Sequence, residues 1–291
     1  MVSEYCSEEA WSILSPIEFS IKKKIEAMGT PLNQWNAKIY RGILTGLNEA
    51  FIISDDTRKR IISEDPKSAE IIRPILRGRD IKRYSYEYSD LYLISTFPSK
   101  KYNIDEYPAV RDFLLSFGIK RLEQTGKKYT INGEEIKARK KTNNKWFETQ
   151  DSISYWDDFD RQKIMYNDIT QRLSFALVPE NMLCVNTVYF IKDNPHIIYL
   201  LAALNSKIID WYYRTLSVQL GEKAVRMFSI YVLDIPIPEP DATVERDIEQ
   251  RVQNILDGNE ADIAESEIER LLSNMYGFTE EEFNFLMEYN A

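Results

Sequence analysis

The sequence predicts an α+β chain: a mixed, largely antiparallel sheet with flanking helices, an N-terminal connector helix and a small acidic helical tail. Short apolar or alternating runs bounded by glycine, proline or asparagine recur through residues 38–191, which is typical of strands. Both ends of the chain show helical spacing of apolar residues instead. Residues 241–291 also hold 14 acidic residues against 3 lysines and arginines. We therefore predict a connector at 1–30, a central domain at 31–240 and the tail at 241–291.

The connector is predicted as a short lead-in helix at residues 3–14 followed by a longer helix. Ser15-Pro16-Ile17-Glu18 is typical of a helix start, because serine and glutamate at this spacing form a capping box and proline suits the first turn. Four apolar residues then share one face: Ile17, Ile21, Ile25 and Met28. Gly29 ends the helix. Its place at the start of the chain suggests a connection to something upstream.

A glycine-bent segment opens the central domain. We predict a strand around Ile39 and Ile43, a turn with Gly42 and Gly46, and a second strand at residues 51–53. Glycine at both bends allows positive φ or close approach to a partner. Three polar side chains flank the bend and are candidates for ligand contact: Arg41, Thr45 and Asn48. The alternative is an ordinary β-hairpin.

A basic turn follows around Gly78. It carries four cations that are candidates for contact with phosphate or guanine: Arg77, Arg79, Lys82 and Arg83. A cationic surface bent by glycine suits phosphate binding. The alternative is a solvated basic turn. Around it we predict short helices from Asp56 and from Asp65-Pro66, the latter stopped by Pro74. A strand at 90–96 and a helix from Pro108 to Gly118 come next.

Residues 118–147 form a basic insertion with 9 lysines and arginines against 3 acidic residues. Asn132-Gly133 is typical of a two-residue hairpin turn. Four cations after it are predicted to contact a polyanion: Lys137, Arg139, Lys140 and Lys141. Because the insertion lacks evident apolar anchors, we expect it to be mobile unless a polyanion orders it. An exposed charged loop without a partner is the alternative.

The second half of the central domain begins with five aromatic residues: Trp146, Phe147, Tyr155, Trp156 and Phe159. Their rings suit either the core or stacking on unpaired bases. Strands are predicted at 163–169, 173–178 and 183–191, a buried helix at 197–215 and an extended segment at 232–238. Two acidic amphipathic helices at 244–256 and 263–275, and a third capped by Thr279, complete the chain.

Several classes of protein are excluded by what the sequence lacks. No apolar stretch is long enough for a membrane span. One histidine, His196, and two distant cysteines, Cys6 and Cys184, do not make a closed zinc site or a convincing catalytic set. No glycine-rich phosphate loop occurs. We therefore expect no catalytic, cofactor or metal site in this chain, which favours a binding protein in a reduced, cytoplasmic setting.

Ordered motifs resemble a known family. They are residues 41–51 (RGILTGLNEAF), 71–81 (IIRPILRGRDI), Trp146 with Tyr155, Lys163-Ile164, Asn186-Thr187, residues 204–207 (LNSK) and 235–238 (IPIP). This order is similar to the TaqI-like C-terminal specificity domain of adenine-specific DNA methyltransferases and type IIG restriction–modification enzymes. The resemblance implies a DNA target-recognition domain at 31–240 that reads base edges in the major groove of double-stranded DNA. The candidate residues of the bend, the basic turn and the insertion would then contact bases or the DNA backbone.

The resemblance also implies a division of labour. An upstream methyltransferase domain or subunit would bind S-adenosylmethionine and flip the adenine, and Mg would serve any cleavage. Two other functions stay open: a metal-dependent nuclease, or a protein-interaction module with an acidic docking tail.

Overall fold

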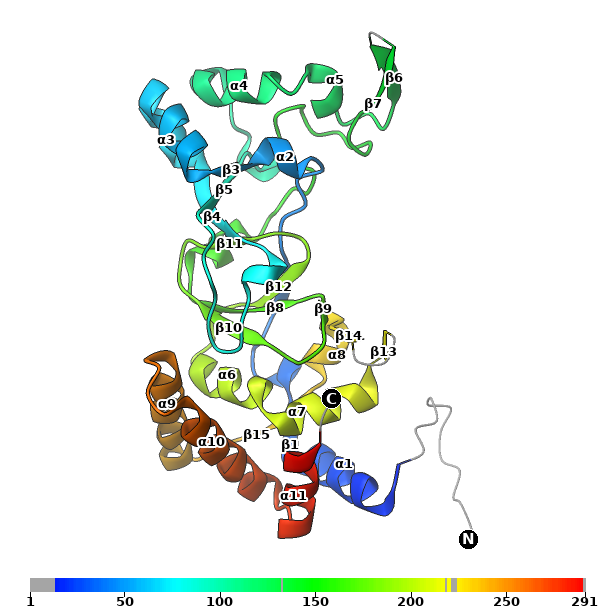
Figure 1. Ribbon diagram of the computed structural model, residues 1–291, viewed down its shortest axis with the longest axis vertical. Helices are drawn as coiled ribbons and strands as arrows, with labels where there is room; N and C mark the ends of the chain where they lie inside the picture. The colour runs from blue at the N-terminus through cyan, green and yellow to red at the C-terminus, as the bar shows by residue number, and fades with distance from the viewer. Residues whose placement is uncertain (1–13, 132, 218, 221–223, 290–291) are drawn as a thin grey trace.

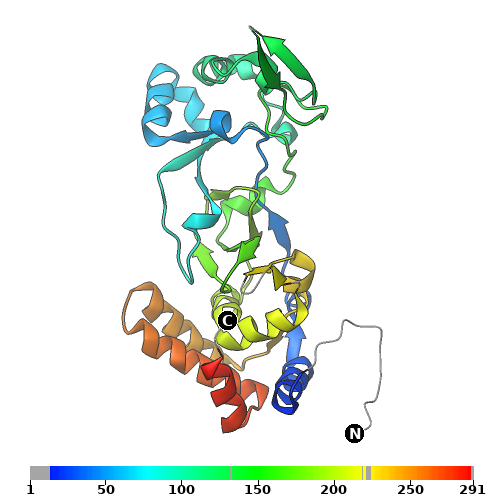
Figure 2. The same ribbon diagram turned by 45° about the vertical axis from the view of Figure 1, so that its right-hand side comes forward.

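The structure is a computed structural model that describes residues 14–131, 133–217, 219–220 and 224–289. The molecule is long, with a small hairpin at one end and a group of helices at the other (Figures 1 and 2). A four-stranded sheet crosses its middle. The predicted lead-in helix at 3–14 lies, apart from Leu14, outside the described residues.

The central sheet separates two hydrophobic cores. Its order is β10-β8-β12-β2, and every neighbouring pair is antiparallel. The strands are β2 (Ile39–Arg41), β8 (Lys163–Asn167), β10 (Phe175–Val178) and β12 (Val188–Ile191). Side chains alternate along a strand. Ile164 and Tyr166 therefore enter one core, which we call the lower core, and Met165 enters the other, the upper core. Burial on both faces explains why these strands read as apolar runs.

A second four-stranded sheet lies in the upper core, with the order β11-β4-β5-β3. Its strands are β3 (Ile52–Ser54), β4 (Ile72–Leu76), β5 (Leu91–Ile94) and β11 (Leu183–Cys184), and only the β11–β4 pair is parallel. The predicted α+β class with largely antiparallel pairing is thus confirmed. The strands are divided among several sheets, however, rather than gathered in one.

Helices cover the upper sheet (Figure 1). They are α2 (Asn48–Phe51), α3 (Asp55–Glu64), α4 (Pro108–Leu115) and α5 (Ile119–Leu122), with 3-10 turns η2 (Pro66–Ile71), η4 (Pro98–Lys100), η5 (Ile104–Glu106) and η6 (Trp156–Asp160). The predicted stop at Pro74 is wrong, because Pro74 lies inside β4 and pairs with Tyr92. The 3-10 turn before it ends three residues earlier, at Ile71.

The lower core contains α6 (Ile197–Asn205) and α7 (Lys207–Leu216). The sequence predicts one helix here, and that prediction is wrong at Ser206. The Ser206 hydroxyl accepts a hydrogen bond from the Ile209 amide at 3.1 Å, so it caps a new helix. Likewise, the predicted strand at 163–169 is split into β8 and β9 (Ile169–Thr170), which joins a small sheet with β13 (Gln219–Leu220) and β14 (Ala224–Arg226).

The two ends of the predicted recognition domain pair with each other as a two-stranded sheet. After α1 (Pro16–Met28), strand β1 (Gly29–Pro31) pairs antiparallel with β15 (Pro236–Pro238). The capping box of α1 is confirmed, and Ile21 and Ile25 are buried. Met28, predicted on the same apolar face, is 56% exposed. The predicted extended segment at 232–238 is also shorter, because α8 (Ser229–Leu233) takes its first residues. A 3-10 turn, η1 (Leu32–Gln34), follows β1.

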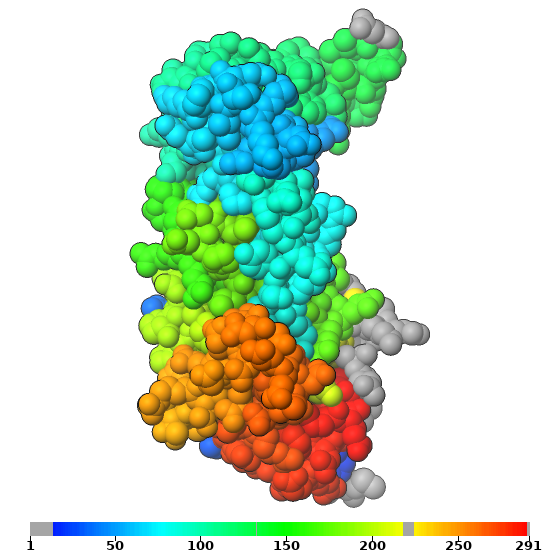
Figure 3. Space-filling model, turned by 60° about the vertical axis from the view of Figure 1, so that its left-hand side comes forward, coloured from blue at the N-terminus to red at the C-terminus, as the bar shows by residue number. Residues whose placement is uncertain are grey.

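The acidic tail forms three helices, as predicted: α9 (Ala242–Leu256), α10 (Ala261–Tyr276) and α11 (Glu280–Glu288). Their apolar faces enter the same core as α6 and α7, through Ile248, Ile268 and Leu286. Figure 3 shows the orange end of the tail lying directly against the cyan segment that carries Arg83. The tail is therefore part of the lower core rather than a free appendage.

Candidate nucleic-acid interface

The glycine-bent segment does not form a hairpin. Strand β2 pairs with β12, whereas β3 pairs with β5 in the other sheet. Between them, Gly42 lies so close to β11 that a Cβ atom there would stand 2.2 Å from the carbonyl oxygen of Val185. Gly46 has a φ of +78°. The two predicted uses of glycine, close approach and positive φ, are both confirmed, one at each bend.

Of the polar residues at this bend, Arg41 and Asn48 are exposed and Thr45 is buried. Arg41 donates from Nε to the Asn186 carbonyl oxygen at 2.8 Å, which holds its guanidinium at the surface. The Thr45 hydroxyl donates to Asn48 Oδ1 at 2.7 Å and accepts from the Leu47 amide at 3.1 Å. The predicted polar contact of Thr45 with DNA is therefore not available in this arrangement.

The basic turn is η3 (Gly78–Asp80), and its four cations have different surroundings. Arg77 donates to both carboxylate oxygens of Asp80, at 3.1 and 3.0 Å. Burial of Asp80 opposes its ionisation, but hydrogen bonds from Arg77 and Ser89 lower the pKa of its carboxyl. Lys82 is exposed and pairs with Glu87 at 3.2 Å.

The other two cations of the turn, Arg83 and Arg79, differ most in their surroundings. Arg83 donates to both carboxylate oxygens of Glu265 at 2.6 Å and to the Asn205 carbonyl oxygen at 2.7 Å. It therefore joins the turn to the acidic tail rather than facing a ligand. The guanidinium of Arg79, in contrast, is exposed and forms no hydrogen bond or ion pair with any described residue.

Arg79 stands at the rim of a hollow of about 330 Å³. Besides Arg79, the hollow is lined by Gly78, Asn167, Asp168, Ile169 and Thr187. These residues come together because the end of β8 pairs with the start of β12, Asn167 opposite Val188. Asn167 and Asp168 were not predicted from the sequence, although an Asn-Asp pair at the end of a buried strand is a recognisable signal. Thr187 was named from the sequence only as part of the Asn186-Thr187 motif, and not as a site residue.

The basic insertion is anchored by buried side chains, so the expectation that it lacks apolar anchors is wrong. Leu122 and Phe147 enter the upper core. Strands β6 (Lys128–Ile131) and β7 (Glu134–Lys137) pair as the predicted hairpin, with Gly133 at a φ of +85°. Asn132 of the predicted turn lies outside the described residues.

Arg139 is a buried part of this anchor. Its guanidinium donates to the carbonyl oxygens of Leu122, Thr45, Glu148 and Trp146. Burial lowers the pKa of Arg139 to about 10. With 4% of its surface exposed, the predicted contact of Arg139 with a DNA backbone has no route in this structure. Lys137, Lys140 and Lys141 are exposed.

The aromatic cluster contributes mainly to the core. Phe147 and Phe159 are buried, whereas Trp146, Tyr155 and Trp156 are half-buried. The Tyr155 ring stacks on Tyr40 at a centroid distance of 4.5 Å, and its hydroxyl donates to the Arg41 carbonyl oxygen at 2.8 Å. Tyr155 thus fixes the strand end that carries Arg41.

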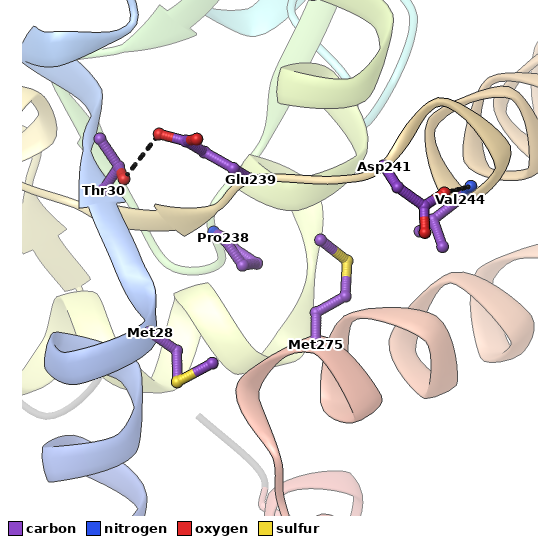
Figure 4. Close-up of a pocket in the computed structure, with 7 residues that line it drawn as sticks. All are labelled: Met28, Thr30, Pro238, Glu239, Asp241, Val244 and Met275. Atoms are coloured by element: carbon purple, nitrogen blue, oxygen red, sulfur yellow. Dashed lines mark hydrogen bonds between the residues drawn. The ribbon is translucent and has the colours of Figure 1, made fainter.

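Another hollow, of about 380 Å³, lies where connector, recognition domain and tail join. Figure 4 shows Met28, Pro238 and Met275 around it, with Thr30 donating to Glu239 at 3.0 Å. In the part of the chain that the structure describes, no group of three or more His, Cys, Asp or Glu side chains is arranged to hold a metal ion. Nor is any described helix long and apolar enough to cross a membrane.

Comparisons with known proteins agree with this arrangement. The model of the TaqI-like C-terminal specificity domain matches residues 73–237. The structure of the type IIL restriction-modification enzyme MmeI in complex with DNA is similar, with a TM-score of 0.61 and 14% identity over 86% of this chain and 35% of that chain. The type IIG restriction endonuclease BpuSI has a TM-score of 0.52 and 12% identity over 90% of this chain and 33% of that chain.

The chain spans about a third of the length of each of these two enzymes. At such low identities the two structures establish a shared fold. The family match covers more than half of the sequence, and it includes the basic turn, β8 and β12 that form the hollow. This chain therefore belongs to the family of the TaqI-like C-terminal specificity domain.

Proposed function

We propose that this chain recognises a specific sequence of double-stranded DNA, as the specificity part of an adenine-specific DNA methyltransferase or a type IIG restriction–modification enzyme. The observation that carries the proposal is the hollow beside η3, which gathers polar side chains without internal partners together with the exposed cation Arg79. Sequence-specific readers need both, because phosphate contacts position the protein and base contacts specify the sequence.

The contacts fall into two groups under this proposal. The first group is Arg41, Asn48 and Arg79, which lie at strand ends and turns of the recognition domain. From there their side chains reach base edges or nearby phosphates. Lys82, Lys137, Lys140 and Lys141 are exposed lysines that bind phosphate. Figure 1 places β6–β7 at one end of the long axis and β8 and β12 near its middle. Such a separation suits contacts spread along a duplex.

A linked methyltransferase domain or subunit completes the activity. It binds S-adenosylmethionine and extrudes the adenine from the helix, which costs a few kcal/mol of unstacking energy. Mg serves cleavage where the parent enzyme cleaves. The present chain contributes recognition, and we place its work in the cytoplasm, where such enzymes meet DNA.

The first test measures how duplex affinity depends on salt. The full chain is titrated against a labelled random-sequence duplex by fluorescence anisotropy at several salt concentrations. Each neutralised phosphate contributes about −0.9 to the log–log slope, so several contacts give a steep slope. The double variant Lys140→Ala/Lys141→Ala should make the slope less negative by about 1–2.

The matched control is Lys22→Ala/Lys23→Ala, which removes the same charge from α1 at the other end of the molecule. It should leave the slope unchanged. Equal loss of slope in both double variants would show that net charge, rather than a defined face, governs binding. Absence of binding to any duplex at low salt would overturn the proposal.

A further inference from the structure

The hollow beside η3 is lined by polar side chains that have no partner among the described residues. The side chains of Arg79, Asn167, Asp168 and Thr187 line it. None of the four forms a side-chain hydrogen bond or an ion pair with any described residue, and Asn167 Oδ1 is fully buried without a partner. Buried polar atoms in folded proteins are normally paired, and an unpaired one costs about 1–3 kcal/mol. A group of this kind therefore indicates a binding site.

The neighbouring cations provide the contrast. Arg77 is neutralised by Asp80 and Arg83 by Glu265. Arg79 lies between them in sequence, only a few residues from each, yet its guanidinium is free of partners among the described residues. It also forms no ion pair with Asp168, although both line the same hollow. Both charges are thus available to a ligand.

Gly78 explains how the turn reaches the strand ends. A Cβ atom at Gly78 would stand 2.9 Å from Asn167 Oδ1 and 3.6 Å from Thr187 Oγ1. A larger residue would push η3, and with it Arg79, away from Asn167 and Thr187. Glycine at this position therefore brings Arg79 and the strand ends into one hollow.

The chemistry of the hollow distinguishes a base pair from a phosphate. A phosphate accepts hydrogen bonds only, and the carboxylate of Asp168 would repel it. The major-groove edge of a G·C pair presents two acceptors on guanine, O6 and N7, and one amino donor on cytosine, N4. An arginine and a carboxylate that line one hollow match these groups. Ile169, which is 46% exposed, adds an apolar wall to the hollow.

We propose that this hollow reads one G·C base pair in the major groove. Arg79 donates to guanine O6 and N7, and Asp168 accepts from the cytosine 4-amino group, while Gly78 and Asn167 position the turn. This inference rests on the proposed function and deepens it, because it names the residues and the base pair. It assigns to Asp168 a role that a solvated surface carboxylate would not have.

The experiment selects duplexes from a random-sequence pool with the full chain and compares the preferred motifs. Wild type should select a motif that contains a G·C pair. Arg79→Ala and Asp168→Ala should both relax discrimination at that same position, by about 5- to 150-fold, and leave the other positions unchanged. Arg79→Lys should keep part of the guanine preference, since lysine also donates to guanine.

Lys82→Ala is the control, because it removes a charge three residues away while its partner Glu87 is a surface residue. It should weaken binding to all sequences without relaxing any position. Relaxation at two different base pairs, or unchanged motifs in both alanine variants, would overturn the inference and leave the proposed function standing. A wild-type chain that selects no motif would overturn the proposed function itself.

Discussion

The guanidinium of Arg139 donates a hydrogen bond of 2.9 Å to the carbonyl oxygen of Thr45, 94 residues earlier in the chain. This bond joins the basic insertion to the glycine-bent segment. The same guanidinium reaches carbonyl oxygens of Leu122, Glu148 and Trp146. Arginine suits this position because its planar fork offers five donors. One buried cation thus holds together two segments that both carry candidate DNA contacts.

Arg139→Ala should lower the free energy of unfolding by about 2–4 kcal/mol, because it leaves several buried carbonyl oxygens without donors. Urea denaturation followed by tryptophan fluorescence measures the change. Lys140→Ala, at the exposed neighbouring position, should change stability by less than about 0.5 kcal/mol. Arg139→Lys should recover little, since an ammonium reaches fewer of the carbonyls. Equal stability of the two alanine variants would contradict this role.

Gly42→Ala should be strongly destabilising. Its Cβ would stand 2.2 Å from the Val185 carbonyl oxygen, and backbone cannot yield as a flexible side chain does. Because Gly42 also donates to the Val188 carbonyl oxygen at 2.8 Å, moving the segment would break its pairing. We expect a loss of about 3 kcal/mol or more, as for other severe core substitutions.

Gly133→Ala provides the comparison for Gly42. Gly133 has a φ of +85°, but apart from its chain neighbours no described residue has a heavy atom within 4 Å of a built Cβ. The substitution should therefore cost only the backbone strain, about 1–2 kcal/mol. Thermal unfolding of the two variants separates steric contact from backbone conformation. Similar losses in both would show that the segment around Gly42 can move away from Val185, and that the close approach does not require glycine.

The local elements were predictable because their signals are local. The capping box at Ser15, the hairpin at Gly133 and the three tail helices follow from residues close in sequence. Strand pairing was not predictable in the same way. Ile39–Arg41 pairs with β12, almost 150 residues later, and no turn signal specifies that partner. Register between distant strands depends on packing of the whole core.

The candidate site was predictable in part for a similar reason. The local sequence identified the cations of the basic turn, but it did not show that Arg83 has a partner among the described residues and Arg79 does not. Their difference arises from Glu265, which lies 182 residues away in sequence. Asp168 and Thr187 meet Arg79 only through the register of β8 and β12. In a sequence, a charged residue that has a partner cannot be told from one without a partner, because the partner is distant along the chain.

The Arg83–Glu265 pair should couple the turn to the tail measurably. The two side chains are 16% and 28% exposed and meet at 2.6 Å, so we expect a coupling energy of about 1–2 kcal/mol. A double-mutant cycle with Arg83→Met and Glu265→Gln gives this value from urea denaturation. The exposed pair Lys82–Glu87 should give less than about 0.5 kcal/mol in a parallel cycle. Equal coupling in the two cycles would contradict a structural role for Arg83.

The stability of the chain should fall as pH rises toward neutrality because of Glu269. Burial raises the pKa of its carboxyl from near 4.5 to about 7, although the Lys207 amide donates to it at 2.5 Å and Arg83 and Lys207 lie nearby. The folded state therefore holds this proton where the unfolded chain has lost it. The contribution of Glu269 to the free energy of unfolding is fully present below about pH 4.5 and is lost as pH rises to about 7.

Glu269→Gln removes this titration and keeps an oxygen that accepts from the Lys207 amide. The variant should gain stability over wild type between pH 5 and about pH 7.5, by up to about 3 kcal/mol. Urea denaturation across this range measures the difference. Glu281→Gln, an exposed substitution on α11, should give a profile parallel to wild type. A parallel profile for Glu269→Gln as well would show that Glu269 is ionised in the folded protein throughout, and that its partners offset its burial.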